Sequence, residues 1–346
     1  MDGTPVKEGR FVRALRREVT PVPPIWLMRQ AGRYQQRYQA LRARHSFDTL
    51  CREPELSAQV AMNSIQDFDF DAAILFSDLL FPLEALGFGL SYDEGPPKLD
   101  GHLTADRLAS LRPWREAAPL LRFQGDAVAA TRARLAPGKG LIGFVGGPWT
   151  LFVYAVEGSH AGALATAKSS PALYARFAAI CVPLLVETIR MQLDAGADVV
   201  MILDTAAGEL ASETFAEFVA PDLAALAGSF PGRIGYYAKA SHPDQVMAPV
   251  FAEAPWGGLG VDSRWSMAPL LARGPRGFVQ GNFDQALLLL PEAELRLALR
   301  LYLEPLSALS PEQRRGWICG LGHGVLPRTP ERHVRIFVDT VREVFA

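Results

Sequence analysis

The sequence predicts an α/β protein, a single-domain (β/α)8 barrel with its active-site cleft at the carboxyl ends of the strands. Short apolar runs recur along the 346 residues, and helix-like segments, often rich in Ala and Leu, separate most of them. The runs span 25–28, 72–76, 141–145, 199–203, 234–238, 258–261, 277–280 and 317–321. A doubly wound sheet is the alternative, but its first strand is usually followed by a Gly-rich dinucleotide turn. This chain has Arg-Gln-Ala-Gly-Arg at 29–33 instead, which favours the barrel.

Composition points to an ordinary soluble globular chain. It is 49% hydrophobic with a formal net charge of −2, so a general affinity for nucleic acid is not expected. There is no repeat beyond the βα period and no shift in composition, so we expect one domain over 1–346. Within it, 1–23 is a surface lead-in segment with a short amphipathic helix at 11–19. We expect 79–98 to be a long loop and 330–346 a closing helix.

The cysteines and the apolar runs bear on the compartment. Cys51, Cys181 and Cys319 are scattered and have no C-x-x-C spacing, which is typical of a reduced compartment and gives no zinc motif. We therefore expect a cytoplasmic protein without a metal site. The longest uncharged run, 141–156, is short for a bilayer span and contains Gly and Pro, so no membrane segment is expected.

Polar residues follow the predicted strands. They are Arg29, Gln30 and Arg33; Ser77 and Asp78; Gly146 to Pro148; Asp204 and Thr205; Lys239 to His242; Asp262 to Arg264; Asn282; and His323. In a barrel the loops after the strands converge on one face, where catalysis takes place, because the interior below is filled by side chains. This pattern predicts where a site lies and leaves its chemistry open.

The stretch 26–34 is the most informative part of this set. Arg29 and Arg33 are four residues apart and follow an apolar run, so both guanidinium groups could face one pocket and bind carboxylates or phosphates. Arg42 lies further along the same segment. The alternative is that each arginine pairs with a nearby Asp or Glu in an ordinary ion pair.

The string LMRQAGRY at 27–34 resembles the N-terminal signature of the uroporphyrinogen decarboxylase family. Further blocks of that family occur in order: FSD at 76–78, GGPWTL at 146–151, QGN at 280–282 and GHG at 322–324. Together they cover nearly the whole chain. The resemblance implies decarboxylation, without a cofactor, of the four acetate side chains of uroporphyrinogen III to give coproporphyrinogen III, by a homodimer with a tetrapyrrole substrate as its partner.

Asp78 is expected to be a half-buried carboxylate at a strand end, and two roles are open for it. One is a structural ion pair with Arg29 or Arg33, and the other is catalysis. In the family that the chain resembles, the matching aspartate receives the pyrrole N–H groups of the substrate. Decarboxylation leaves two electrons behind, and without a recognisable cofactor motif the protonated ring must accept them. A fixed carboxylate would stabilise that cationic ring.

The resemblance also implies the remaining site residues. The catalytic candidates are Asp78, Arg29 and His323, and the substrate-binding candidates are Arg29, Gln30, Ala31, Gly32, Arg33, Arg42, Asp78, Tyr154, Thr205 and His323. Tyr154 could instead be a packed aromatic residue and His323 a histidine that caps a strand end. Thr205 departs from the family's usual Ser but keeps the hydroxyl.

The other polar residues receive structural interpretations. Asp262 and Asn282 are expected to support loops from buried positions. The histidines outside the matched motifs are expected to have no functional role, and they are His45, His102, His160, His242 and His333.

Two other functions remain open. A zinc-dependent corrinoid or thiol methyltransferase on the same barrel would need soft ligands such as a His-x-Cys pair, whereas 262–264 reads Asp-Ser-Arg. A catalytically silent tetrapyrrole-binding protein would need only the arginines, and the presence of Asp78, Tyr154 and His323 favours an enzyme over it.

Overall fold

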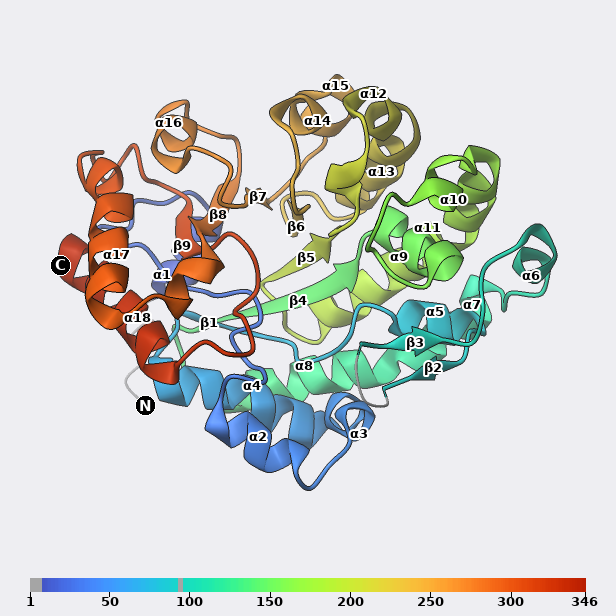
Figure 1. Ribbon diagram of the computed structural model, residues 1–346, viewed down its shortest axis with the longest axis horizontal. Helices are drawn as coiled ribbons and strands as arrows, with labels where there is room; N and C mark the ends of the chain where they lie inside the picture. Colours follow the sequence, from blue (N-terminus) through green and yellow to red (C-terminus); the bar gives the residue numbers. More distant parts are fainter. Residues whose placement is uncertain (1–7, 93–95) are drawn as a thin grey trace, which may run out of the picture.

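The computed structural model describes residues 8–92 and 96–346. Within them a curled parallel sheet is surrounded by helices (Figure 1), and its strand order follows the chain, β1-β4-β5-β6-β7-β8-β9. The strands are β1 (Ala72–Ile74), β4 (Gly140–Gly146), β5 (Val199–Leu203), β6 (Ile234–Tyr237), β7 (Gly258–Gly260), β8 (Phe278–Phe283) and β9 (Trp317–Leu321). Since neighbouring strands are parallel, all their carboxyl ends lie at one end of the sheet.

Helices connect these strands and cover the outside of the sheet. Before β4 they are α1 (Arg10–Leu15), α2 (Gln36–Arg42), α3 (Phe47–Arg52), α4 (Pro54–Phe68), α5 (Phe81–Leu86), α6 (Ala105–Ala109), α7 (Trp114–Ala117), η1 (Ala118–Leu121) and α8 (Arg122–Arg134). From β4 to β7 they are α9 (Pro148–Glu157), α10 (Ala165–Lys168), α11 (Pro171–Asp194), η2 (Ala207–Glu209), α12 (Ser212–Thr214), η3 (Phe215–Val219), α13 (Ala220–Ser229), α14 (Pro243–Met247) and α15 (Pro249–Ala252). After β7 they are α16 (Met267–Ala272), η4 (Gln285–Leu289), α17 (Glu292–Ser307) and α18 (Glu331–Phe345).

The predicted first strand, 25–28, is present only as a single bridge. Ile25 pairs in parallel with Cys319 of β9, and the Trp26 amide donates to the Cys319 carbonyl over 3.2 Å. On the other side, the Asp71 amide donates to the Ile25 carbonyl over 2.9 Å, directly before β1. The segment around Ile25 therefore takes the eighth place in the barrel and joins β9 to β1, which agrees with the predicted fold class.

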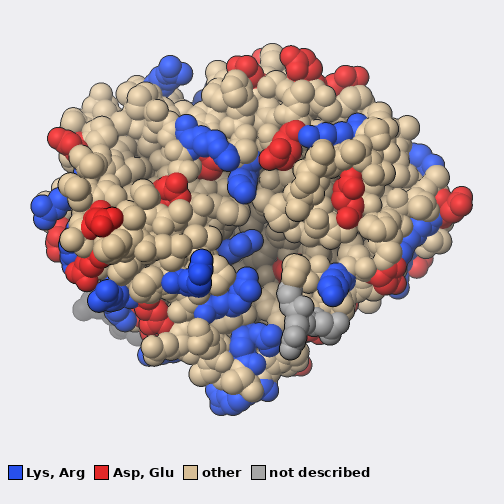
Figure 2. Space-filling view, in the orientation of Figure 1, with Lys and Arg blue, Asp and Glu red and all other residues tan. Residues whose placement is uncertain are grey.

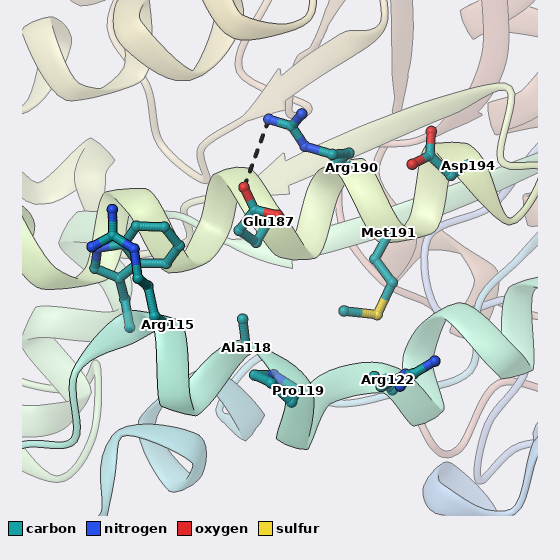
Figure 3. A pocket seen from close by; sticks show the side chains of 9 residues that line it. Arg115, Ala118, Pro119, Arg122, Glu187, Arg190, Met191 and Asp194 are labelled. Carbon is teal, nitrogen blue, oxygen red and sulfur yellow. Dashed lines mark ion pairs between the residues drawn. The ribbon is translucent and has the colours of Figure 1, made fainter.

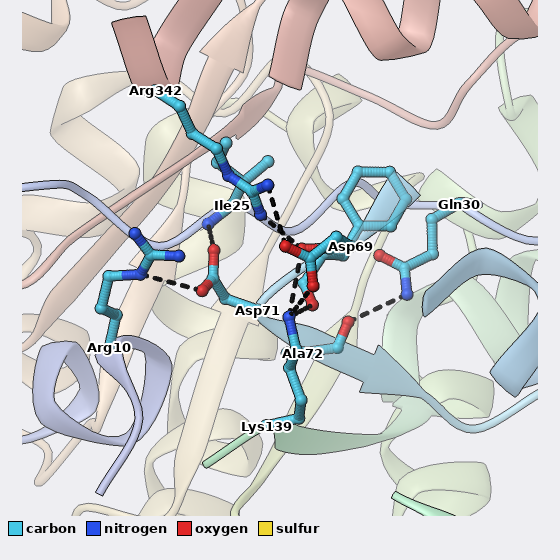
Figure 4. Close-up of polar contacts among 9 residues, drawn as sticks. Arg10, Ile25, Gln30, Asp69, Asp71, Ala72, Lys139 and Arg342 are labelled. Atoms are coloured by element: carbon cyan, nitrogen blue, oxygen red, sulfur yellow. Dashed lines mark hydrogen bonds and ion pairs between the residues drawn. The ribbon is translucent and has the colours of Figure 1, made fainter. Parts of the chain in front are cut away.

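Side chains reinforce this junction at the amino end of β1 (Figure 4). The buried Asp71 carboxylate accepts the Ile25 amide over 2.8 Å and the Arg10 guanidinium over 3.1 Å. Beside it, the Lys139 ammonium lies 2.6 Å from the Asp69 carboxylate, which ties the start of β4 to the start of β1. Loss of Asp71 would leave a buried amide unpaired, at a cost of roughly 1–3 kcal/mol. These contacts fix the end of the barrel opposite the predicted site.

The other strand predictions are confirmed, with small differences in length. β5 and β9 match the predicted runs, β1 ends two residues early, and β8 continues to Phe283. The closing helix predicted at 330–346 is α18, and it buries Phe337 against the barrel.

Two local predictions need correction. The segment 79–98 is not a simple loop, because it contains α5 and an antiparallel hairpin of β2 (Leu90–Ser91) and β3 (Lys98–Leu99). Phe81 and Leu86 of α5 are buried, and this packing gives the segment its order. The lead-in helix α1 is shorter than predicted and buries Phe11, so it is fastened to the barrel and is not purely a surface segment. Parts of both segments, 93–95 and 1–7, lie outside the described residues.

In the described chain, α11 alone is long and apolar enough to cross a membrane, judged by length and composition. It contacts β4, β5, α8 and α9, and it buries Phe177, Leu184 and Ile189. These contacts are those of an outer helix of the barrel, since its apolar side covers the sheet.

Candidate functional site

Lysine and arginine side chains gather around a hollow near the middle of the face in Figure 2. Arg29 follows the Ile25 segment, is exposed, and has a left-handed backbone with φ 57°. Non-glycine residues in this conformation are uncommon and concentrate at functional sites. The turn is held by the Val325 amide, which donates to the Met28 carbonyl over 2.9 Å. Two separate parts of the chain therefore fix the backbone turn that carries Arg29.

Arg29 lies close enough to three other predicted site residues to act on their ionisation. Its positive charge opposes the burial-driven rise in the pKa values of Asp78 and Tyr154, and it adds to burial in lowering the pKa of His323. These residues follow different elements: β1, α9 and β9. The structure therefore places Asp78, Tyr154 and His323 within the field of Arg29, and their roles in a site stay a prediction.

Asp78 is a half-buried carboxylate just beyond β1. Its Oδ1 accepts the Leu80 amide over 2.8 Å, and among the described residues it forms no ion pair. Burial raises the pKa of Asp78, while the Leu80 amide, the Tyr92 hydroxyl and the charge of Arg29 act in the opposite direction. The Tyr92 hydroxyl is buried near Asp78, and burial, followed by the charge of Asp78, raises the pKa of Tyr92. The structural ion pair considered for Asp78 is therefore absent from the described part of the chain.

His323 stacks on Tyr237, which ends β6. The ring centroids are 5.9 Å apart and the planes differ by 10°. The Tyr237 hydroxyl lies 2.7 Å from the Gly322 carbonyl and 3.1 Å from His323 Nδ1. Because a phenol has one proton and a carbonyl can only accept, that proton goes to Gly322, and Nδ1–H of His323 donates to the phenol oxygen. A neutral His323 then presents an unprotonated Nε2, which can take up a proton.

The ionisation of His323 gives a stability prediction. Burial and the charges of Arg29 and Lys239 lower the pKa of His323 from 6.5 to about 4. Between these values the unfolded chain binds more protons than the folded chain, so stability is lost as the pH falls through this window. We expect the free energy of unfolding to fall less steeply from pH 6.5 to pH 4 in His323→Gln than in the parent. Denaturant titrations of both proteins across this range measure it, and parallel pH curves would contradict it.

Tyr154 lies on α9 and is half-buried, and its hydroxyl is 2.7 Å from His160 Nδ1. The prediction that His160 has no functional role did not anticipate this contact. Of the other histidines, His333 bonds the Leu288 carbonyl from the core, and His242 caps α14. Both have the structural roles expected for them.

Thr205 lies in the turn directly after β5 and is half-buried. Among the described residues its hydroxyl makes no hydrogen bond at accepted distances, so the group is free to meet a ligand. We expect Thr205→Ser to be nearly silent and Thr205→Val to raise KM roughly 5–10-fold with a smaller change in kcat, because a ground-state hydrogen bond is lost. Steady-state kinetics on the two variants measure this, and a Val variant as good as the parent would remove Thr205 from the site.

Gln30 lies beneath the site. Its side chain is fully buried, and its Nε2 donates to the Ala72 carbonyl of β1 over 3.0 Å. The Gln30 carbonyl accepts the Tyr34 hydroxyl over 2.6 Å and the Ser64 hydroxyl over 2.9 Å. The side chain therefore fastens the turn that carries Arg29. Ala31 and Gly32 are half-buried in that turn.

Arg33 and Arg42 lie at a second position, around Tyr38 of α2. Both are exposed, and their charges oppose the effect of burial, which raises the pKa of Tyr38. The Arg42 guanidinium donates to the His45 carbonyl over 2.6 Å. The rings of Tyr38 and Phe76 have centroids 5.7 Å apart, and Phe76 lies two residues before Asp78. Arg33 and Arg42 therefore lie on the α2 side of the same strand end, with their positive charges exposed.

Two residues near the site were not predicted as part of it, and a third was given no role. Tyr237 has the pattern of a core strand residue, and Tyr92 stands in the segment predicted to be a loop, so neither gives a local signal. Lys239 is exposed directly after β6. Burial is the main cause that lowers the pKa values of His160 and His323, and the charge of Lys239 adds to it. Its position after a strand placed it on the predicted face, although no role was assigned to it.

Buried polar residues support the loops. The Asp262 carboxylate accepts the Ala240 amide over 2.6 Å and the Arg264 guanidinium over 2.7 Å. The Asn282 amide donates to the carbonyls of Asp262 and Trp265. Both residues are nearly inaccessible, so the supporting roles expected for them fit their contacts.

A separate groove of about 580 Å³ lies on the outer helices. Figure 3 shows Arg122 and Pro119 on one side and α11 on the other, where Arg190 lies 3.7 Å from Glu187. Its mixed charges and its place on the outside of the barrel set it apart from the strand ends. The three cysteines are free and buried, and residues 8–92 and 96–346 contain no group of three or more His, Cys, Asp or Glu arranged to hold a metal ion.

Comparison with known proteins identifies the relatives of this chain. A family model described as uroporphyrinogen decarboxylase (URO-D) matches residues 6–344. The uroporphyrinogen decarboxylase of Anaeromyxobacter dehalogenans (strain 2CP-C) is 38% identical, with 96% of this chain and 97% of the relative covered. That of Mus musculus is 33% identical, with 98% and 94% covered.

A solved structure, a methyltransferase from Methanosarcina mazei, has a TM-score of 0.73 at 19% identity and covers 97% of this chain and 98% of its own. At that identity the likeness shows the barrel fold alone. The family model and the sequence relatives both extend over nearly the whole chain. The chain therefore belongs to the uroporphyrinogen decarboxylase family.

Proposed function

We propose that this protein removes the four acetate carboxyl groups of uroporphyrinogen III as carbon dioxide and gives coproporphyrinogen III, without a metal or organic cofactor. The observation that carries the proposal is Asp78, a half-buried carboxylate beyond β1 that lies in the field of Arg29 and, in the described part of the chain, forms no ion pair. A buried carboxylate without a cationic partner destabilises a protein, so its presence here indicates a ligand that supplies positive character. Membership in the family supports this substrate.

The chemistry explains why a carboxylate is useful. Loss of carbon dioxide from an acetate side chain leaves an electron pair on the methylene carbon, and this pair needs an acceptor. Protonation of the neighbouring pyrrole carbon makes the ring cationic, and the ring can then take up the pair as the C–C bond breaks. A second proton converts the methylene to a methyl group, and the ring carbon gives up the first proton, which restores the neutral pyrrole. Asp78, facing the ring N–H groups, stabilises the cation that forms before the bond breaks.

The other groups hold the substrate. Uroporphyrinogen carries eight carboxylates, and Arg29 can bind one of them close to Asp78. His323 is suited to bind a propionate or to hold a proton through Nε2. Tyr154 and Thr205 offer hydroxyl groups to further carboxylates. The substrate-binding role of the segment Gln30–Arg33 then rests on its backbone and on Arg33.

Arg42 is proposed to attract the outer carboxylates of the substrate together with Arg33. Both are exposed, and bidentate contact between guanidinium and carboxylate is favourable there only when several charges act together. The zinc-dependent methyltransferase and the silent binding protein are the alternatives that the test must separate.

Incubation of the purified protein with uroporphyrinogen in the dark and without air tests the function. We expect chromatography to show products with seven, six, five and then four carboxylates, and turnover should survive dialysis against a strong chelator. Tight binding without any loss of carboxylate would indicate a silent binding protein. Activity abolished by chelation and restored by zinc would favour the methyltransferase.

We further propose one domain over 1–346, a homodimer and a cytoplasmic location, in line with the family. The single large buried core that runs from Phe11 to Phe345 supports one domain. Sedimentation of the purified chain tests the dimer, since a monomer at catalytic concentrations would exclude it.

A further inference from the structure

The loop after α9 carries a histidine over the candidate site. Gly158 ends α9 in a left-handed conformation with φ 76°, and the chain then turns back toward the helix. As a result His160 lies over Tyr154, with ring centroids 5.5 Å apart and Nδ1 2.7 Å from the phenol oxygen. On the other side of the loop, Glu157 accepts the Ala167 amide over 2.9 Å, which fixes the start of the loop.

This contact decides what the Tyr154 hydroxyl can offer to a ligand. If Nδ1 of His160 accepts, the phenol proton is used, and the oxygen can only accept a further hydrogen bond. If Nδ1–H donates, the phenol proton is free for a ligand acceptor such as a carboxylate. A cationic imidazole has no acceptor and must donate. A neutral ring can take either role, according to its tautomer, whereas protonation of His160 leaves the Tyr154 hydroxyl to donate to the ligand.

The electric field at His160 depends on whether a ligand is bound. Lys239 and Arg29 face it, His323 lies in the same field, and Tyr154 is its direct partner. Burial and the charges of Lys239 and Arg29 lower the pKa of His160, which favours the neutral ring while these cations are uncompensated. A polycarboxylate bound to them reverses the field and favours protonation.

We propose that His160 is a positioning residue that takes up a proton when the polycarboxylate substrate binds, donates Nδ1–H to the Tyr154 oxygen, and so leaves the Tyr154 hydroxyl to donate to a substrate carboxylate. This inference rests on the proposed function, because it takes the tetrapyrrole carboxylates as the ligand. It assigns a role to a histidine outside the motifs that identify the family.

The test compares His160→Phe, which keeps the ring and loses the hydrogen bond, with His160→Gln, whose amide can donate to Tyr154 but does not titrate. At pH 7 we expect the Phe variant to raise KM about tenfold, with kcat within about twofold, and the Gln variant to restore most of this loss. From pH 6 to pH 8, KM should rise in the parent and stay flatter in the Gln variant. Ser159→Ala, in the same loop, should match the parent in every measurement.

Coupling to Tyr154 gives the sharper test. His160→Phe should change nothing further in a Tyr154→Phe background, because the hydroxyl through which it acts is gone. Additive effects in this double-mutant cycle, or equal pH dependence of KM in the parent and the Gln variant, would overturn the proposal. Turnover of uroporphyrinogen by the parent protein tests the proposed function separately from the role of His160. If the parent does not turn over, the anaerobic dissociation constant of uroporphyrinogen gives the same comparison among variants.

Discussion

We expect Asp78→Asn to lower kcat by ~10²–10³-fold, the loss typical of removing one preorganised electrostatic partner. The substitution keeps the size of the side chain and keeps an Oδ1 that can accept the Leu80 amide. What it removes is the negative charge that would face the cationic ring. Because that cation is absent from the bound ground state, KM should change much less than kcat.

The same variant separates catalysis from a structural role through its stability. Burial raises the pKa of Asp78 above its ordinary value, so any stability linked to the protonated form is lost as the pH rises through the folded pKa. At neutral pH the charge of Asp78 therefore destabilises the fold. The Asp78→Asn variant should melt at the temperature of the parent or above it. If Asp78 formed a structural ion pair, the substitution would instead lower the free energy of unfolding by roughly 3–5 kcal/mol.

Thermal melting and turnover of one Asp78→Asn preparation measure both effects. The matched control is Asp126→Asn, an exposed carboxylate on α8, which should leave both unchanged. A variant that melts well below the parent yet turns over normally once folded would remove Asp78 from catalysis.

Most strands could be predicted from the sequence because they are apolar runs buried on both sides, as in β5 and β9. The exception, 25–28, shows the limit of that reasoning. Its place in the barrel depends on one bridge to Cys319 and on the Asp71 side chain, which no local pattern reports. Likewise α5 is ordered by burial of Phe81, a tertiary effect within a segment rich in Gly and Pro.

In the site, motif resemblance grouped Arg29 with Asp78, and the fold brings both to one place. It could not tell that the Gln30 side chain points down to the Ala72 carbonyl, because the direction of a side chain in an irregular turn is set by tertiary contacts. The contact between His160 and Tyr154 depends on how the chain turns after Gly158, and so it also lay beyond sequence patterns.

The second large effect is expected for Gly324→Ala, through Arg29. A Cβ added at Gly324 would lie 2.7 Å from Cγ of Arg29, closer than real Cβ contacts allow, and 3.1 Å from Cβ of Arg29, which is also tight. The glycine is not in the left-handed region, so alanine is compatible with its backbone. The Arg29 backbone is held by the bond from the Val325 amide to the Met28 carbonyl, so the side-chain stem must move.

We therefore expect Gly324→Ala to lower kcat/KM by ~10²-fold, the loss that follows from a displacement of about 1 Å at a positioned group. Gly228→Ala is the matched control, since a Cβ there meets nothing within 4 Å and alanine suits the interior of α13. In an Arg29→Ala background, Gly324→Ala should add little, because the group that it displaces is absent. Kinetics on the single and double variants measure this coupling. A Gly324→Ala enzyme with normal kcat/KM would show that the position of Arg29 does not limit turnover.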